Sequence, residues 1–114
     1  MSGESKPRLT VGDTPIRRTV AFGKGVLTYE FVEPTLEHRI AAAVMVSAQS
    51  GENDQFSLYR AMMVQCVLSL NGEAILPTDK GRAAFWSKLR YVVAFHVQND
   101  FIAAIQSTEA DLGN

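Results

Sequence analysis

The stretch that decides the fold is Gly25-Val-Leu-Thr-Tyr-Glu-Phe-Val-Glu-Pro-Thr-Leu-Glu-His38, where the pattern changes from that of a strand to that of a helix. Leu27, Tyr29 and Phe31 occupy alternate positions, as in a strand with one buried face. Pro34 has no backbone N–H with which to continue a hydrogen-bonded ladder. The strand is therefore expected to end before Pro34, with a helix following at once.

A hairpin is predicted upstream of this point. Two apolar-rich segments, residues 17–22 and 26–32, flank the connection Gly23-Lys24-Gly25. Glycine readily adopts the positive φ values that tight hairpin turns require. The N-terminal half should therefore contribute a two-stranded hairpin with one buried face.

The first helix is expected over about residues 35–49. Thr35 is a suitable cap, and Glu37 would lie near the positive end of the helix dipole. Apolar residues then recur at helical spacing, namely Leu36, Ile40, Ala43 and Val44.

Two further helical regions are predicted. Asp54 is a plausible cap for a second helix that would end at Leu70, before the termination signal Asn71-Gly72. A third region begins near Thr78 or Asp79 and continues to about residue 106. It is either one long helix or a helix followed by a shorter one that Gln98-Asn-Asp100 would cap.

These elements predict a single α+β domain in which an N-terminal β-hairpin packs on three or four α-helices. The predicted domain covers residues 16–106, between a flexible arm over residues 1–15 and a frayed tail over residues 107–114. At 114 residues the chain is long enough to bury one compact core.

Composition disfavours several classes of function. Eleven Lys and Arg against twelve Asp and Glu give a formal charge of −1, which favours neither nucleic acid nor an anionic membrane as the main partner. The N-terminal residues lack the apolar core of a secretory signal, and the single cysteine cannot form an internal disulfide. No uncharged stretch is long enough to span a bilayer as a helix. We therefore expect a cytoplasmic protein with no membrane association.

Candidate catalytic and ligand-binding groups are sparse. His38, His96 and Cys66 do not have metal-ligand spacing, and Cys66 lies in an apolar helix where an inert thiol is expected. A Cys66–His96 nucleophile pair is the remaining enzymatic alternative. Three other weak motifs have simpler structural interpretations. Gly23-Lys24-Gly25 is a turn, and the arginines Arg8, Arg17 and Arg18 form a solvated edge. The carboxylates Glu30, Glu33 and Glu37 serve as capping and solvated edge groups. We expect no catalytic residue, metal or cofactor.

Surplus apolar surface is the stronger signal. Aromatic and methionine side chains often line protein-binding surfaces, and a small helical core has limited room for them. Spacing alone leaves open whether these side chains form the core or an interface. The residues predicted to contact a partner are Tyr59, Met62, Met63, Trp86 and Phe95.

The order of elements resembles a known family. A strand reading Leu27-Thr-Tyr-Glu-Phe-Val-Glu-Pro-Thr35 leads directly into a helix, and Leu70-Asn-Gly-Glu-Ala-Ile75 precedes the last helical region. Over residues 18–105 this arrangement is similar to tail assembly chaperones of long-tailed bacteriophages.

The resemblance implies a non-catalytic protein that binds and solubilises the tape measure protein and helps recruit tail tube subunits. Its partners would be the tape measure protein and the tail tube protein, with possible self-association, in the cytoplasm of the host cell. The alternative is a small phage or bacterial regulatory or adaptor protein that binds a host factor through an apolar helical face.

Overall fold

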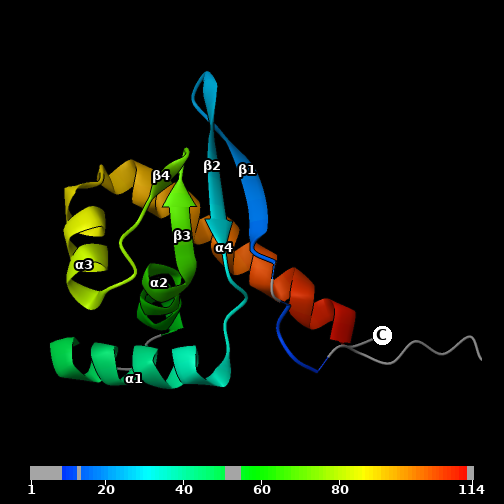
Figure 1. Cartoon of the computed structure of the whole chain (residues 1–114), viewed down its shortest axis with the longest axis vertical. Coiled ribbons are helices and arrows are strands. Elements are labelled where there is room, and N and C mark those ends of the chain that lie inside the picture. Colours follow the sequence, from blue (N-terminus) through cyan, green and yellow to red (C-terminus); the bar gives the residue numbers. More distant parts are fainter. Residues whose placement is uncertain (1–8, 13, 51–54, 113–114) are drawn as a thin grey trace, which may run out of the picture.

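The computed structural model describes residues 9–12, 14–50 and 55–112, with side chains described to residue 47 in the first helix and residue 107 in the last. The chain has an α+β fold, as predicted (Figure 1). Among the described residues, four strands form one antiparallel sheet in the order β1-β2-β3-β4. The sheet is therefore larger than the two-stranded hairpin that the sequence predicted. Most of the predicted arm and the predicted cap Asp54 lie outside the described residues.

The predicted N-terminal hairpin is confirmed. It consists of β1 (Ile16–Phe22) and β2 (Gly25–Phe31), and Phe22 pairs with Gly25 across the turn. Gly23 in this turn has a φ of 58°, a value that residues with a Cβ rarely adopt. The glycine at this position therefore fixes the tight connection between the two strands.

The predicted buried face of β2 is also confirmed. Leu27, Tyr29 and Phe31 are buried, and the ring of Phe31 meets that of Phe101 edge to face at 5.3 Å. Phe101 belongs to the long helix α4 (Tyr91–Leu112), which runs behind the sheet in Figure 1. Burial of alternate strand residues against this helix forms the centre of the core.

The strand-to-helix step has the predicted cap. α1 (Leu36–Ser50) follows Thr35, whose Oγ1 accepts a hydrogen bond from the N–H of His38 at 3.4 Å. In return, the N–H of Thr35 donates to Nδ1 of His38 at 3.0 Å. This reciprocal pair is a capping box in which histidine takes the place of the usual glutamate or glutamine.

The predicted second helix is too long. α2 (Gln55–Cys66) ends at Cys66, and β3 (Val67–Leu70) follows at once, pairing with β2 on one side and with β4 (Glu73–Ala74) on the other. Asn71 and Gly72 have φ values of 50° and 82°, so they form a hairpin turn instead of ending a helix. β3 is stabilised as a strand because the open edge of β2 offers hydrogen-bond partners to the backbone of residues 67–70.

The last helical region contains a break that neither sequence alternative placed correctly. α3 (Asp79–Lys88) is followed by Leu89, whose backbone is extended, and α4 begins at Tyr91. Gln98-Asn-Asp100 lies inside α4, which continues to Leu112 beyond the predicted end near residue 106. The predicted cap of α3 is confirmed, because Thr78 Oγ1 accepts a hydrogen bond from the N–H of Gly81 at 3.0 Å.

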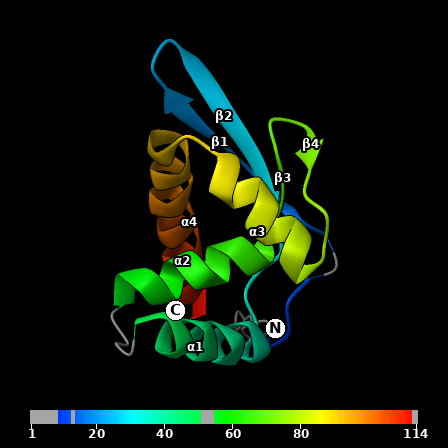
Figure 2. The same ribbon diagram turned by 90° about the vertical axis from the view of Figure 1, so that its left-hand side faces the viewer.

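The helices enclose the core from one side of the sheet. Figure 2 shows α1 below α2, with α3 and α4 beside them. Buried residues of α2, including Met62, Met63 and Cys66, share one apolar cluster with Phe101 and Val97 of α4. None of the helices in the described part of the chain combines the length and apolar character needed to cross a membrane.

Candidate protein-binding surface

The first helix presents an apolar row on the side facing away from the core. Leu36, Ile40 and Val44 are spaced by four residues, and their exposed fractions are 73%, 56% and 65%. Residues at this spacing lie on one face of a helix. We refer to these three residues as the α1 stripe.

The core face of α1 differs from the row that the sequence singled out. Ala42 and Val46 are the buried residues, with Ala43 and Met45 packed against the core cluster. Small side chains at the contact allow two helix backbones to approach closely, which suits the packing of α1 on α2. Of the predicted row, Ala43 packs against the core, whereas Leu36, Ile40 and Val44 are available for contacts outside the chain.

The five predicted interface residues occupy different environments. Met62 and Met63 are 6% and 2% exposed and belong to the core cluster. Tyr59 and Trp86 are partly buried beside the core, and Phe95 is 37% exposed.

Three of these five residues meet at a cavity of about 240 Å³ between α2, α3 and α4. Met63, Trp86 and Phe95 line it, together with the exposed Tyr91, whose ring stacks on that of Phe95 at a centroid distance of 5.9 Å. The other two, Tyr59 and Met62, line a separate cleft of about 480 Å³ beside the strand-to-helix junction. Leu36 of the α1 stripe also borders that cleft.

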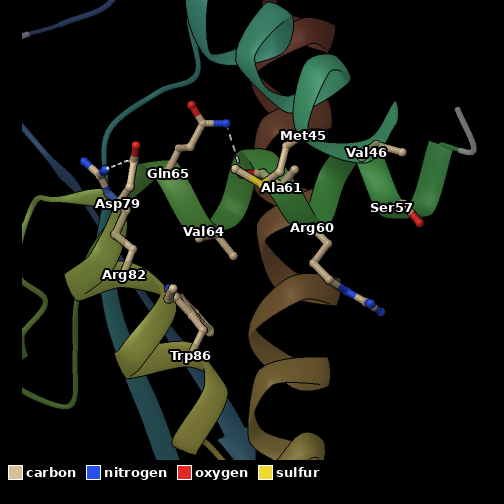
Figure 3. A pocket seen from close by; sticks show the side chains of 11 residues that line it. Met45, Val46, Ser57, Arg60, Ala61, Val64, Gln65, Asp79, Arg82 and Trp86 are labelled. Atoms are coloured by element: carbon tan, nitrogen blue, oxygen red, sulfur yellow. Dashed lines mark hydrogen bonds and ion pairs between the residues drawn. The ribbon is translucent and has the colours of Figure 1, made fainter. Parts of the chain in front are cut away.

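A further cleft of about 390 Å³ lies between α1, α2 and α3; we call it the three-helix cleft (Figure 3). It shares Arg60, Val64 and Trp86 with the smaller cavity, so the two hollows adjoin. Its walls combine apolar and polar side chains. The lining residues include Met45, Val46, Ala61, Val64, Asp79, Arg82 and Trp86.

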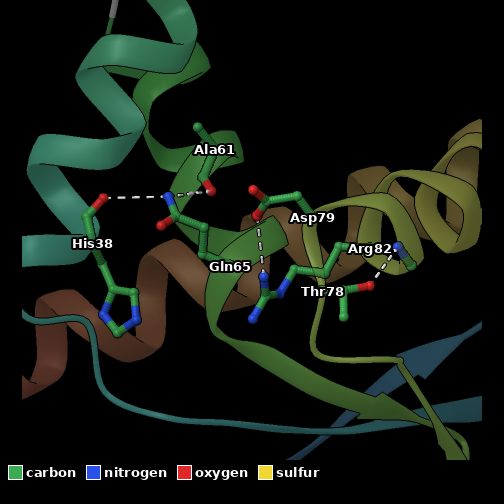
Figure 4. A network of polar contacts seen from close by, with 7 residues as sticks. His38, Ala61, Gln65, Thr78, Asp79 and Arg82 are labelled. Carbon is green, nitrogen blue, oxygen red and sulfur yellow. Dashed lines mark hydrogen bonds and ion pairs between the residues drawn. The ribbon is translucent and has the colours of Figure 1, made fainter.

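Gln65 fixes the two helices at the edge of the three-helix cleft. Its Nε2 donates hydrogen bonds to the carbonyl of His38 on α1 at 3.3 Å and to that of Ala61 on α2 at 3.1 Å (Figure 4). Because one side chain bridges two helices, the spacing of the cleft walls is set by a directional contact as well as by apolar packing.

A second polar cluster fastens the hairpin to α4. Arg18 donates from Nε and Nη2 to the two carboxylate oxygens of Asp100, at 2.9 Å and 2.8 Å. The hydroxyl of Tyr29 donates to the same carboxylate at 2.7 Å. The guanidinium of Arg18 holds the pKa of Asp100 below its usual value, while burial and the bond to Asp100 raise the pKa of Tyr29. The three side chains serve as hydrogen-bond donors and acceptors for one another, which indicates a structural role.

The candidate enzymatic pair does not come together as hydrogen-bond partners. Cys66 is fully buried, and burial raises the pKa of its thiol to about 12. Nδ1 of His96 contacts the carbonyl oxygen of Val92 at 2.8 Å, and its ring packs edge to face on Phe22. A thiol with so high a pKa carries almost no thiolate at neutral pH, and the thiolate is the nucleophile.

The remaining charged groups near the sheet serve local contacts. Glu30 accepts a hydrogen bond from Ser69 Oγ at 3.1 Å and lies 3.9 Å from Arg17. In the described parts of the chain, no three His, Cys, Asp or Glu side chains gather closely enough to hold a metal ion.

Sequence reasoning did not identify Arg82, Gln65 or Asp100 as important residues. Arg18 and Asp100 are separated by 82 residues, and a single sequence has no signal that pairs them. In comparisons with known proteins, no family model, curated protein or solved structure matches this chain.

Proposed function

We propose that this chain is a non-catalytic tail assembly chaperone of a long-tailed bacteriophage, which binds and solubilises the tape measure protein and helps recruit tail tube subunits. The observation that supports the proposal best is the α1 stripe, since Leu36, Ile40 and Val44 all stay more than half exposed. A contiguous apolar patch on a small protein is typical of a surface that contacts another protein. An apolar row at a spacing of four is also the pattern by which helices pack on one another.

A tape measure protein is a long helical chain with many apolar faces, and it needs protection before the tail tube surrounds it. A chaperone for such a chain must offer apolar surface without unfolding. The α1 stripe meets this requirement because its opposite face, Ala42 and Val46, is buried in the core. Apolar side chains on α1 can therefore be covered by a partner while the fold remains intact.

The proposal is tested by co-expression with its proposed partner, the long helical tape measure protein of the same phage, followed by size-exclusion chromatography. We expect the long protein to become soluble and to elute together with this chain. If it stays insoluble and no complex elutes, the chaperone proposal is wrong, and the stripe would serve another partner, as the adaptor alternative predicts.

A double substitution tests the role of the stripe. Ile40→Glu with Val44→Glu should weaken the complex by at least about 10-fold, equivalent to about 1.4 kcal/mol, because each carboxylate would have to lose water on binding. The matched control is Ala41→Glu, at an exposed position of the same helix outside the stripe. Equal binding by the double variant and the control would exclude the α1 stripe from the interface.

A further inference from the structure

The three-helix cleft contains a cation with few partners. This cation is Arg82 of α3, which lines the cleft and whose side chain is 24% exposed. Within the described chain its side chain has one ionic contact, from Nη1 to Oδ1 of Asp79 at 3.5 Å (Figures 3 and 4). Asp79 itself is fully exposed to water, so this contact is weak. A guanidinium has five N–H donors, and among the described residues only Nη1 of Arg82 has a hydrogen-bond acceptor.

Arg60, the other arginine of the cleft, is already engaged. Its Nε donates to Oε1 of the buried Gln98 at 3.2 Å, and its guanidinium lies 5.1 Å from the centre of the Phe56 ring. These partners are uncharged, so Arg60 keeps its charge, and Arg82 is the arginine of the cleft that shares α3 with Trp86.

One turn further along α3, Trp86 has an unsatisfied donor. Its Nε1 is buried and has no hydrogen-bond partner among the residues that the structure describes. An unpaired buried donor costs about 1–3 kcal/mol, so a small movement of the ring that gave it an acceptor would be favourable. Trp86 borders both the three-helix cleft and the adjoining cavity, where a bound segment could provide that acceptor.

The cleft wall also has an apolar part, beside the polar Ser57 and Gln65. Met45 and Val46 come from α1, and Ala61 and Val64 from α2. An apolar slot with a cation at one end is complementary to an apolar side chain that has a carboxylate nearby. On a helix, residues three or four apart lie on the same face and can provide this pair.

We propose that the three-helix cleft is the docking site for a helical segment of a partner protein, which packs apolar side chains against Val64 and Trp86 and places a carboxylate on Arg82. This inference rests on the proposed function, since it assigns a second contact site for the tape measure protein, in addition to the α1 stripe. The charge at the cleft favours this occupant over nucleic acid. The cleft lining contains two cations, Arg60 and Arg82, and one carboxylate, Asp79, whereas a phosphate backbone requires several unopposed cations.

The inference can be tested without the natural partner, because Trp86 is the only tryptophan and its indole N–H gives one resonance in a ¹H–¹⁵N spectrum. The probes are a panel of capped helical peptides of about 18 residues, five turns long, each with a leucine face and one flanking Glu. Each peptide has a twin in which Gln replaces the Glu. We expect the Glu peptides to shift the indole resonance and to bind at least about 10-fold more tightly than their twins.

Arg82→Gln should abolish this preference for Glu, whereas Arg82→Lys should keep part of it because the charge remains. Lys80→Gln is the matched control, with the same loss of charge at an exposed position of α3 outside the cleft. Thermal unfolding of each variant shows whether the fold is retained. If no peptide of the panel shifts the indole resonance, or if the Gln twins bind as tightly as the Glu peptides, the inference is wrong.

A second arm separates this inference from the proposed function. If the long helical protein forms a complex that Arg82→Gln does not weaken, the chaperone proposal stands and the docking site is wrong. If the Glu peptides bind at Trp86 but the long protein forms no complex, the docking site stands and the tape measure protein is not its occupant.

Discussion

At the scale of single residues, the best-defined interaction is the cluster of Arg18, Tyr29 and Asp100. Two parallel N–H bonds from a guanidinium to a carboxylate are among the stronger polar contacts in proteins. The Asp100 side chain is 15% exposed and that of Arg18 is 40% exposed, so water screens the pair only in part. Removing the charge of Asp100 would leave Arg18 without its carboxylate and Tyr29 with a weaker acceptor.

Asp100→Asn should therefore lower the free energy of unfolding by about 1–3 kcal/mol near neutral pH. The pKa of Asp100 is lowered in the folded state, so its contribution is complete above the unfolded value of about 3.9 and is lost as the pH falls through the folded value. The measurement is urea unfolding of wild type and variant at about pH 7 and about pH 3, on either side of the pKa of an unfolded aspartate.

The difference between wild type and Asp100→Asn should shrink at the lower pH, because acid protonates Asp100 in the unfolded wild-type chain before it does so in the folded protein, and it leaves the asparagine unchanged. Asp79→Asn is the control, since that carboxylate is fully exposed and makes only a 3.5 Å contact. A difference for Asp100→Asn that stays constant between the two pH values would contradict this account.

At the scale of elements, the hairpin of β3 and β4 is held to β2 through its turn. The side-chain Oδ1 of Asn71 accepts a hydrogen bond from the N–H of Thr28 at 2.8 Å, and the N–H of Asn71 donates to the carbonyl of Thr28. Asn71 also has a positive φ. One residue therefore supplies both the turn conformation and a contact to the neighbouring strand.

Substitutions at Asn71 can separate these two roles. Asn71→Ala loses the side-chain acceptor and also strains the backbone, so we expect a loss of about 2–3 kcal/mol in unfolding free energy. Asn71→Gly keeps the favourable turn conformation and loses only the acceptor, so its loss should be about 1 kcal/mol. Chemical denaturation measures both variants, and equal losses would show that the backbone conformation contributes nothing.

The elements also show how far sequence reasoning reaches. The β2 strand, its buried face and the caps Thr35 and Thr78 were predictable because each depends on neighbouring residues. The end of α2 was not, because Val67 and Leu70 continue a helical row with Met63 and, being three residues apart, do not show the alternation of a strand. The Asn71-Gly72 pair was the available signal, since this dipeptide favours a hairpin turn in which both residues have positive φ.

The break at Leu89 and the assignment of the interface had no comparable local signal. No proline or glycine separates α3 from α4, and Leu89 packs against the core cluster, which is a tertiary effect. Met62 and Met63 were placed among surface candidates because spacing does not distinguish a core row from an exposed row. The same ambiguity concealed the α1 stripe, whose residues have ordinary core spacing.

At the scale of the whole molecule, Cys66 reports on the integrity of the core. It is the only cysteine, and it lies at the junction of α2 and β3 with no exposed surface. Reaction with a thiol reagent requires the core to open, and burial also keeps the sulfur protonated, with a pKa raised to about 12.

We expect a disulfide reagent to label native Cys66 at least about 100-fold more slowly than the unfolded chain, which corresponds to an opening cost of roughly 2.7 kcal/mol or more. The control is Cys66→Ala with Ser87→Cys, which moves the thiol to an exposed position on α3 and should react rapidly. If the labelling rate of native Cys66 were within a few-fold of the rate of the control variant, the core would be open to solvent in the folded protein.

The pairing of Arg18 with Asp100 also has a consequence for how the protein is made. The carboxylate follows the arginine by 82 residues, so a ribosome must synthesise most of the described chain before the hairpin can be fastened to α4. Contacts between segments so distant in sequence form late, after the entropy of closing a long loop has been overcome. During translation the apolar faces of the hairpin and of α2 therefore lack their final cover, and the nascent chain is most prone to aggregation until α4 emerges.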